Sequence, residues 1–201
     1  LVLFYHAGNS YLKTEEVQLA TSHFSDIPLK KLLNFGRQGV QLFFTLSGYI
    51  LAVPFWRMYC SKAPKPVDLK AFYLRRLTRL EPPYIISLVI FLLAKVFVVE
   101  EHWAELVPHF FASLFYLNNF LYQEYPLINT VAWSLEIEVQ FYLLAPLLAL
   151  VFRFGQVTRR ALLVGVIIAH VTFLNGFFPP PPHYFSLVGY LQFFLLGMLL
   201  C

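Results

Sequence analysis

The segment Trp133–Glu138 (WSLEIE) runs directly into the apolar segment Val139–Leu148 (VQFYLLAPLL). Two carboxylates, Glu136 and Glu138, therefore open a stretch that is otherwise typical of a membrane-spanning helix. A carboxylate in hydrocarbon costs roughly 2.5–3.5 kcal/mol on insertion scales, so it usually faces a cavity and serves a function. The alternative is that both acids lie at the water interface, in the first helical turn, where the helix dipole favours anions.

The composition is that of an integral membrane protein. Of the 201 residues 59% are hydrophobic and 13% are charged, whereas about a quarter are charged in soluble domains. We expect an all-α, polytopic transmembrane bundle with about six spans, in a single domain (residues 1–201) that is truncated at both ends. The apolar runs are too long and too continuous for barrel strands. The expected spans are the end of a helix at Leu1–Ala7, then Gly39–Trp56, Pro82–Val99, Trp133–Phe152, Ala161–Phe178 and Tyr184–Cys201.

The charges alternate between loops in a way that predicts the topology. The loop from Arg57 to Arg79 is strongly basic and holds the single acid Asp68, so the positive-inside rule makes it cytoplasmic. Arg153, Arg159 and Arg160 mark a second cytoplasmic loop, and the acidic loop with Glu100, Glu101 and Glu105 suits the outer side. This alternation leaves Phe110–Gln123 without a crossing, so we expect an interfacial or re-entrant helix there.

Three arginines, Arg75, Arg76 and Arg79, crowd a short helix that we expect to end before Pro82-Pro83 or to lead there into the next span. Guanidinium groups match phosphate oxygens, so the cluster could hold a phosphorylated ligand. The alternative is topological, because basic residues beside a cytoplasmic membrane face attract anionic lipid.

His6 and Ser47 are further candidates. An imidazole is the side chain best suited to take a proton at neutral pH, although a lone histidine near a helix end is more often structural. The small pair Ser47-Gly48 allows another backbone to approach closely, for helix packing or for a ligand chain. No motif or spacing predicts a metal site, a disulfide framework, a permanently bound cofactor or a nucleic-acid partner.

Helical geometry separates the two acids of the first segment. Two residues correspond to about 200° around a helix, so Glu136 and Glu138 cannot both point into one pocket. Ser134, Glu138 and Tyr142 share a face. Glu136 shares the other face with Gln140. We therefore expect one acid to be functional and the other to be interfacial.

Together these segments resemble the acyltransferase-3 family of integral-membrane acyltransferases. Four blocks match in order, between residues 4 and 148. The resemblance covers essentially the whole chain but only part of the family's ten-helix domain. The family's arginine pair early in the first helix would fall before Leu1. The blocks are Phe4-Tyr5-His6, Gly39-Val40-x-Leu42-Phe43-Phe44-x-Leu46-Ser47-Gly48-Tyr49, Arg75-Arg76-x-x-Arg79-Leu80-x-Pro82-x-Tyr84, and Trp133-Ser134-Leu135-x-x-Glu138-x-x-Phe141-Tyr142 followed by Pro146.

The resemblance implies transfer of an acyl group, often acetyl, from cytoplasmic acyl-CoA to a hydroxyl of an extracytoplasmic glycan or lipid-linked acceptor. It implies an integral protein of the bacterial cytoplasmic membrane, with an extracytoplasmic partner domain as one way to complete the transfer. His6 and Glu138 would be catalytic, with Glu138 buried in the bundle near His6 and Glu136 close to the outer interface. Arg75, Arg76 and Arg79 would bind the CoA phosphates. The substrate-binding positions would be Ser47, Tyr84, Trp133, Ser134 and Tyr142.

Two other functional classes stay open. A transporter or flippase would also line its path with ionisable groups, but its usual sign is an internal repeat or paired broken helices, and the sequence contains no repeat. A membrane sensor or scaffold would use the polar blocks for packing alone.

Overall fold

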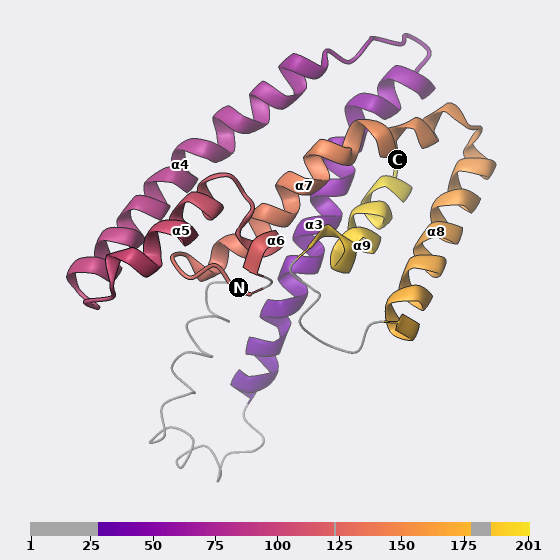
Figure 1. Ribbon diagram of the computed structural model, residues 1–201. Coiled ribbons are helices and arrows are strands. Elements are labelled where there is room, and N and C mark those ends of the chain that lie inside the picture. Colours follow the sequence, from indigo (N-terminus) through magenta and orange to yellow (C-terminus); the bar gives the residue numbers. More distant parts are fainter. Residues whose placement is uncertain (1–27, 123, 178–185) are drawn as a thin grey trace. The chain divides into compact units, whose positions relative to one another are not determined.

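The computed structural model describes residues 28–122, 124–177 and 186–201, which belong to two compact units, residues 1–44 and 45–201. The described part of the first unit is the helical segment 28–44, and the same helix continues into the second unit. The described residues form helices and no strand, which confirms the all-α prediction (Figure 1). The elements are α3 (Pro28–Cys60), α4 (Leu69–Phe97), α5 (Trp103–Leu114), α6 (Asn118–Tyr122), η1 (Thr130–Ala132), α7 (Trp133–Leu148), η2 (Ala149–Arg153), α8 (Gln156–Phe177) and α9 (Leu187–Leu199).

Four segments of the described chain are long and apolar enough to cross a membrane, so this is an integral membrane protein. They correspond to the second to fifth predicted spans. The last predicted span appears as α9, a shorter apolar helix of 13 residues, and Leu1–Ala7 lies outside the described residues. The four segments are Gln38–Cys60, Leu69–Phe97, Thr130–Arg153 and Gln156–Leu174.

The described part of the run Phe110–Gln123 consists of the end of α5 and the short helix α6, and neither helix is long enough to cross a membrane. This agrees with the alternation of charged loops. The chain breaks between α5 and α6 at Tyr116, whose φ of 58° lies in the left-handed region. That conformation is uncommon for a residue with a side chain. The Tyr116 ring stacks on the ring of Tyr84 in α4, with centroids 4.9 Å apart, and this contact helps to hold the turn.

The structure corrects the expected start of the second full span. We expected a basic loop as far as Arg79 and a separate span from Pro82. Instead α4 is one helix of 29 residues that begins at Leu69, and Asp68 caps it by accepting a hydrogen bond from the Ala71 amide at 3.2 Å. Both prolines lie inside α4, which membrane helices tolerate. At about 1.5 Å per residue α4 is roughly 44 Å long, more than the hydrocarbon thickness of about 30 Å, so its arginine-bearing turns can extend to the headgroups.

Two glycines bring α3 and α9 into backbone contact. A Cβ added at Gly48 would collide with the backbone of Phe194, and one added at Gly197 would collide with the backbone at Thr45 and Tyr49. The Ser47-Gly48 pair therefore does allow a close approach, which confirms the packing interpretation for Gly48.

Next to this crossing, α7 contacts α9 in two ways. The Phe141 and Phe194 rings stack with centroids 4.1 Å apart, and Gln140 Oε1 accepts a hydrogen bond from the Leu187 amide at 2.8 Å. Gln140 thus caps the first turn of α9, because the Ser186 side chain makes no such bond.

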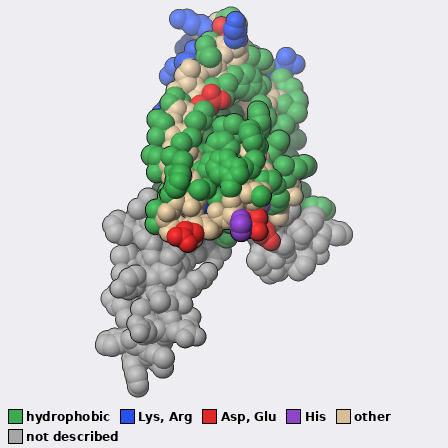
Figure 2. Space-filling model, turned by 60° about the vertical axis from the view of Figure 1, so that its left-hand side comes forward, with side chains coloured by type: hydrophobic (Ala, Val, Ile, Leu, Met, Phe, Trp, Pro, Cys, Tyr) green, Lys and Arg blue, Asp and Glu red, His purple; other side chains and the backbone are tan. Residues whose placement is uncertain are grey.

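Charged side chains gather at opposite ends of the second unit, with apolar side chains between them on the face that Figure 2 shows. At the basic end the last turn of α3 lies beside η2 and the start of α8, since Arg159 of α8 donates to Cys60 Sγ and Arg153 lies over the Tyr59 ring. At the acidic end the α4–α5 connection carries Glu100 and Glu101 (Figure 1). This grouping of the loops is the one that the predicted alternation requires.

Candidate functional site

Glu138 is the centre of a polar group that we call the Glu138 cluster, made of Ser47, Arg76, Glu138 and Tyr142. Ser47 and Tyr142 are hydrogen-bonded to the acid, and the half-buried Arg76 lies within electrostatic range of it. Ser47 Oγ donates to Glu138 Oε1 at 2.8 Å, and Tyr142 OH donates to the same oxygen at 2.6 Å. Glu138 is 5% exposed, which confirms its predicted burial. Among the described residues neither hydroxyl donates to Oε2, so this oxygen is left for another partner.

The arginines of α4 contribute unequally to this cluster. The guanidinium of Arg76 lies 3.6 Å from the Phe72 ring centroid and 6.0 Å from that of Tyr142, and its Nη1 donates to the Phe72 carbonyl. Glu138 lies within electrostatic range of both Arg79 and Arg76. Arg75 is exposed, and it interacts electrostatically with the like charge of Arg76. Two of the three predicted arginines, the half-buried Arg76 and the exposed Arg79, therefore lie within electrostatic range of the acid.

A small apolar cavity of about 190 Å³ lies beside the cluster, between α4 and α7. Its lining is apolar, and Arg76 and Tyr142 contribute carbon atoms to it beside Leu77, Leu80 and Val139. A cavity of this size and lining can take a short hydrocarbon group.

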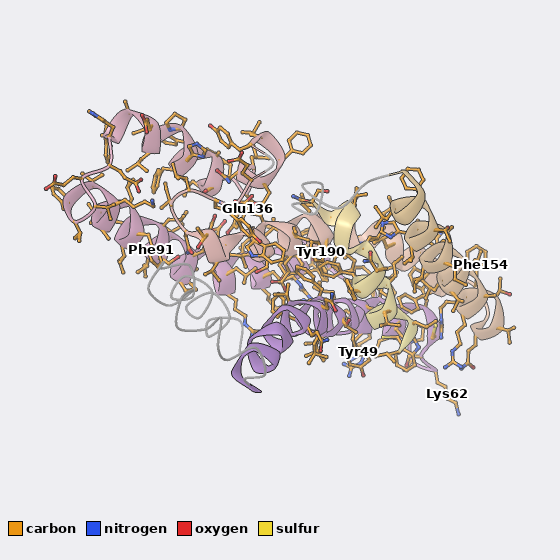
Figure 3. The ribbon with its side chains drawn as sticks, turned by 90° about the horizontal axis from the view of Figure 1, so that it is seen from below. Tyr49, Lys62, Phe91, Glu136, Phe154 and Tyr190 are labelled. Atoms are coloured by element: carbon orange, nitrogen blue, oxygen red, sulfur yellow. The ribbon has the colours of Figure 1, made fainter. Side chains whose placement is uncertain are left out.

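Glu136 is not interfacial as expected but fully buried, at 0% exposure. It lies inside the molecule, toward α5 and α6, whereas Lys62 projects outward (Figure 3). Its Oε2 accepts a hydrogen bond from the Asn119 amide at 2.8 Å, and Asn119 Nδ2 donates to the Trp133 carbonyl at 2.7 Å. The geometric separation of the two acids was predicted correctly, but the second side of α7 faces α6 rather than water.

Several polar atoms around Glu136 are buried without a hydrogen-bond partner among the described residues. They are Glu136 Oε1, Asn119 Oδ1, Asn118 Nδ2 and Ser113 Oγ, and all four residues are 0% exposed. We call these four residues the Glu136 cluster. Buried polar groups are normally satisfied, so such atoms mark places where water or a ligand group can bind.

Three other predicted substrate-binding residues are engaged with the protein itself. Tyr84 is 4% exposed and donates its hydroxyl to the Ser113 carbonyl at 2.7 Å. Trp133 packs between the rings of Tyr125 and Tyr190. Ser134 Oγ donates to the Val131 carbonyl at 3.4 Å rather than to Glu138. Of the three residues predicted to share a face of α7, Glu138 and Tyr142 are hydrogen-bonded to each other. The Ser134 hydroxyl bonds to the Val131 carbonyl instead.

His6 lies outside the described residues. Among the residues that are described, no group of three or more His, Cys, Asp or Glu side chains could hold a metal ion.

Sequence reasoning missed the Glu136 cluster. The available signal was the pair Asn118-Asn119, two amides within the otherwise apolar run 110–123. Polar side chains at membrane depth are costly and usually functional or tightly paired, so this pair merited the same attention as the two glutamates.

Comparisons with known proteins point to one family. The sequence profile of Acyl_transf_3, described as "Acyltransferase domain", matches residues 1–201. Peptidoglycan O-acetyltransferase OatA of Listeria monocytogenes is 32% identical over 124 residues, which are 57% of this chain and 20% of that protein. O-acetyltransferase OatA of Staphylococcus aureus is 33% identical over 124 residues, with the same coverage of 57% and 20%. A putative O-acetyltransferase of Staphylococcus aureus, SACOL0978, is 29% identical over 128 residues, 59% of this chain and 21% of that protein.

The match thus spans about a fifth of the length of these relatives. No solved structure matches the chain.

Proposed function

The chain belongs to the Acyl_transf_3 family of acyltransferase domains, and on this premise we propose that the protein transfers an acyl group, acetyl above all, from acyl-CoA to a hydroxyl of an extracytoplasmic acceptor. The observation that carries the proposal is the Glu138 cluster, a carboxylate held by two hydroxyls beside two arginines within apolar helices. The names of the relatives, which are O-acetyltransferases, support acetyl as the group and a hydroxyl as the acceptor.

The proposed reaction divides the work between the two ends of the molecule. Acyl-CoA binds from the basic end, on the cytoplasmic side, where Arg75, Arg76 and Arg79 attract its phosphates. The acyl group then lies near the apolar cavity between α4 and α7, with its thioester carbonyl toward Arg76 and Tyr142. A glycan or lipid-linked acceptor approaches from the acidic, outer end. One relative is named for peptidoglycan, which supports a cell-wall glycan and a bacterial cytoplasmic membrane.

Glu138 has a proton-handling role in this proposal. Because Ser47 and Tyr142 both occupy Oε1, Oε2 can accept a hydrogen bond from the imidazole of His6 or from the acceptor hydroxyl. His6 would take the hydroxyl proton as general base. The hydroxyl oxygen then forms the ester bond, the thioester C–S bond breaks, and the CoA sulfur receives a proton.

The decisive experiment uses the full-length protein in sealed vesicles. Acyl-CoA labelled in the acyl group is supplied on the cytoplasmic face, and a glycan acceptor on the other face. Label that appears in an ester of the acceptor, and only when the protein is present, supports acyl transfer. Labelled acyl-CoA that stays unchanged while the acceptor itself crosses the membrane would support a transporter instead.

Substituting His6→Ala provides the internal test of the assigned base. Transfer should be abolished while membrane insertion is kept. Near-normal turnover would exclude His6 from catalysis.

A further inference from the structure

The Glu136 cluster lies where α5, α6 and α7 meet, since α6 packs against both of the other helices. Glu136 Oε2 accepts from the Asn119 amide, which joins α7 to α6. Tyr84, whose hydroxyl donates to the Ser113 carbonyl of α5, lies within electrostatic range of Glu136. The four residues of the cluster are 0% exposed, so whatever completes their hydrogen bonds must lie inside the molecule.

The hydrogen bonds that do form fix which atom of each amide is left over. Asn118 Oδ1 lies 3.0 Å from His109 Nδ1. An amide oxygen can only accept, so the ring nitrogen donates and Asn118 Nδ2 remains as an unused donor. Asn119 is turned the other way, because its Nδ2 donates to the Trp133 carbonyl at 2.7 Å and its Oδ1 remains as an unused acceptor.

The unused atoms therefore include both donors and acceptors. Glu136 Oε1 is an oxygen without a partner among the described residues, and the Ser113 hydroxyl can donate as well as accept. A cation would meet the amide donor of Asn118, and an anion would meet the Glu136 carboxyl. A hydroxyl group donates and accepts at once, so it suits this set of atoms with the carboxyl in either protonation state.

A chain of contacts runs from the cluster to the molecular surface. His109, which bonds to Asn118, is half-buried, and its ring stacks on the Tyr122 ring with centroids 3.9 Å apart. Tyr122 is 37% exposed. Two rings thus stand between the Asn118 amide and the surface on this side of α5 and α6.

We propose that the Glu136 cluster binds hydroxyl groups, which donate to Glu136 Oε1 or Asn119 Oδ1 and accept from Asn118 Nδ2. The Ser113 hydroxyl is a further partner. The bound hydroxyl belongs either to internal water, which typically bonds to about three otherwise unsatisfied polar groups, or to a sugar. Only the sugar source rests on the proposed function, in which a glycan is the acceptor.

Ser113 gives the sharpest test, because its hydroxyl has no partner within the described part of the chain while its carbonyl accepts from Tyr84. A substitution of the side chain leaves that carbonyl in place. If the hydroxyl is unpaired, Ser113→Ala removes an unsatisfied buried group and should raise the unfolding temperature. If it bonds to a bound hydroxyl, the same substitution should lower the unfolding temperature or weaken ligand binding.

The full-length protein in nanodiscs is used for two measurements. The first is the unfolding temperature without any glycan, and the second is the binding of an N-acetylglucosamine tetrasaccharide by titration. The variants are Ser113→Ala and Ser113→Cys, since cysteine fills similar space with a weak hydrogen-bonding group. The control is Thr172→Val in α8, which removes an exposed hydroxyl that bonds only to its own helix.

We expect both Ser113 variants to fall below the parent protein in one measurement, and Thr172→Val to match the parent in both. An unfolding temperature lower by about 2–4 °C without glycan identifies water as the source. Tetrasaccharide binding weakened by about tenfold, with unchanged unfolding, identifies a sugar hydroxyl. Parent-like binding with unfolding temperatures at or above that of the parent overturns the proposal. A loss in Ser113→Ala that Ser113→Cys does not share also overturns it, because the effect is then one of packing.

The two proposals can fail separately. If acyl transfer occurs but the Ser113 variants match the parent in both measurements, the reaction stands and the hydroxyl site is wrong. If the variants show the expected loss but no acyl transfer occurs, the hydroxyl site stands and the proposed reaction is wrong.

Discussion

Glu136 and Glu138 stand two positions apart on α7 and end in different polar clusters, because the helix turns about 200° between them. Glu138 meets hydroxyls of α3 and of its own helix, whereas Glu136 meets the amides of α6. Because both side chains are the same carboxylate on the same helix, the same substitution can be compared at the two positions. The two residues should therefore respond differently to the same substitution.

For Glu138→Gln we expect acyl transfer to fall by about a hundredfold or more, the range of a lost acid–base group. The amide keeps an oxygen that can accept from Ser47 and Tyr142, so the fold should persist. Initial rates with labelled acyl-CoA, normalised to inserted protein, provide the measurement. Gly165→Ala in α8 is the control, since nothing lies within 4 Å of an added Cβ there. Unchanged rates for Glu138→Gln would exclude a proton-handling role.

For Glu136→Ala we expect lower stability, by about 1–3 kcal/mol, because the Asn119 amide loses its acceptor while still buried. Glu136→Gln keeps an acceptor and should cost less. Thermal unfolding of the purified proteins in detergent gives the comparison. Equal unfolding temperatures for the alanine variant and the parent would show that water replaces the carboxylate at this position.

At the level of single residues the burial of Glu138 was predicted correctly, and the interfacial position of Glu136 was predicted wrongly. Both outcomes have one physical reason. Periodicity determines which side chains share a face of α7, but it does not tell what packs against each face. The α6 segment, which buries Glu136, is a five-residue helix held by tertiary contacts rather than by its own periodicity. The buried state of Arg159 was hidden in the same way, since its partners come from distant segments.

Among the helices, the crossing of α3 and α9 depends on the absence of side chains at Gly48 and Gly197. A methyl group at either position would overlap backbone atoms of the partner helix, which cannot move away as a flexible side chain can. The crossing also positions Ser47, the neighbour of Gly48, against Glu138. Packing at this crossing and the geometry of the Glu138 cluster are thus linked.

For Gly197→Ala we expect destabilisation of about 1–3 kcal/mol or more, the usual cost of overpacking, together with reduced acyl transfer. Gly165→Ala in α8 is the matched control, because nothing lies within 4 Å of its added Cβ. Alanine there should be neutral or stabilising by up to about 1 kcal/mol, since glycine is a poor helix former. Similar unfolding temperatures for the two variants would contradict the close crossing.

The predicted elements were most accurate where apolar runs are bounded by charged loops, as in α7. The start of α4 was misjudged because Pro82-Pro83 was taken as a boundary, whereas a helix within a membrane accommodates proline. Sequence could not show that the arginine turns and the apolar turns form one continuous helix.

The whole second unit has a basic end and an acidic end, and the positive-inside rule predicts that the basic end is cytoplasmic. A cysteine introduced as Glu101→Cys should react with a membrane-impermeant maleimide in intact cells. Lys62→Cys should react only after the cells are permeabilised. Both are placed in a background in which Cys60 and Cys201 are replaced by serine. The opposite pattern would invert the topology, and with it the proposed direction of acyl transfer.

The position of the Glu138 cluster between these two ends has a consequence for the charge balance of the reaction. In the proposed reaction the acceptor hydroxyl loses its proton on one side of the membrane, and the CoA thiolate gains one on the other. If the buried carboxylate relays that proton inward as the acyl group moves outward, each turnover is electroneutral. The rate should then be the same with and without a potassium diffusion potential across proteoliposomes. If the proton is instead released outside, one charge equivalent crosses per turnover, and each 100 mV would oppose transfer by about 2.3 kcal/mol.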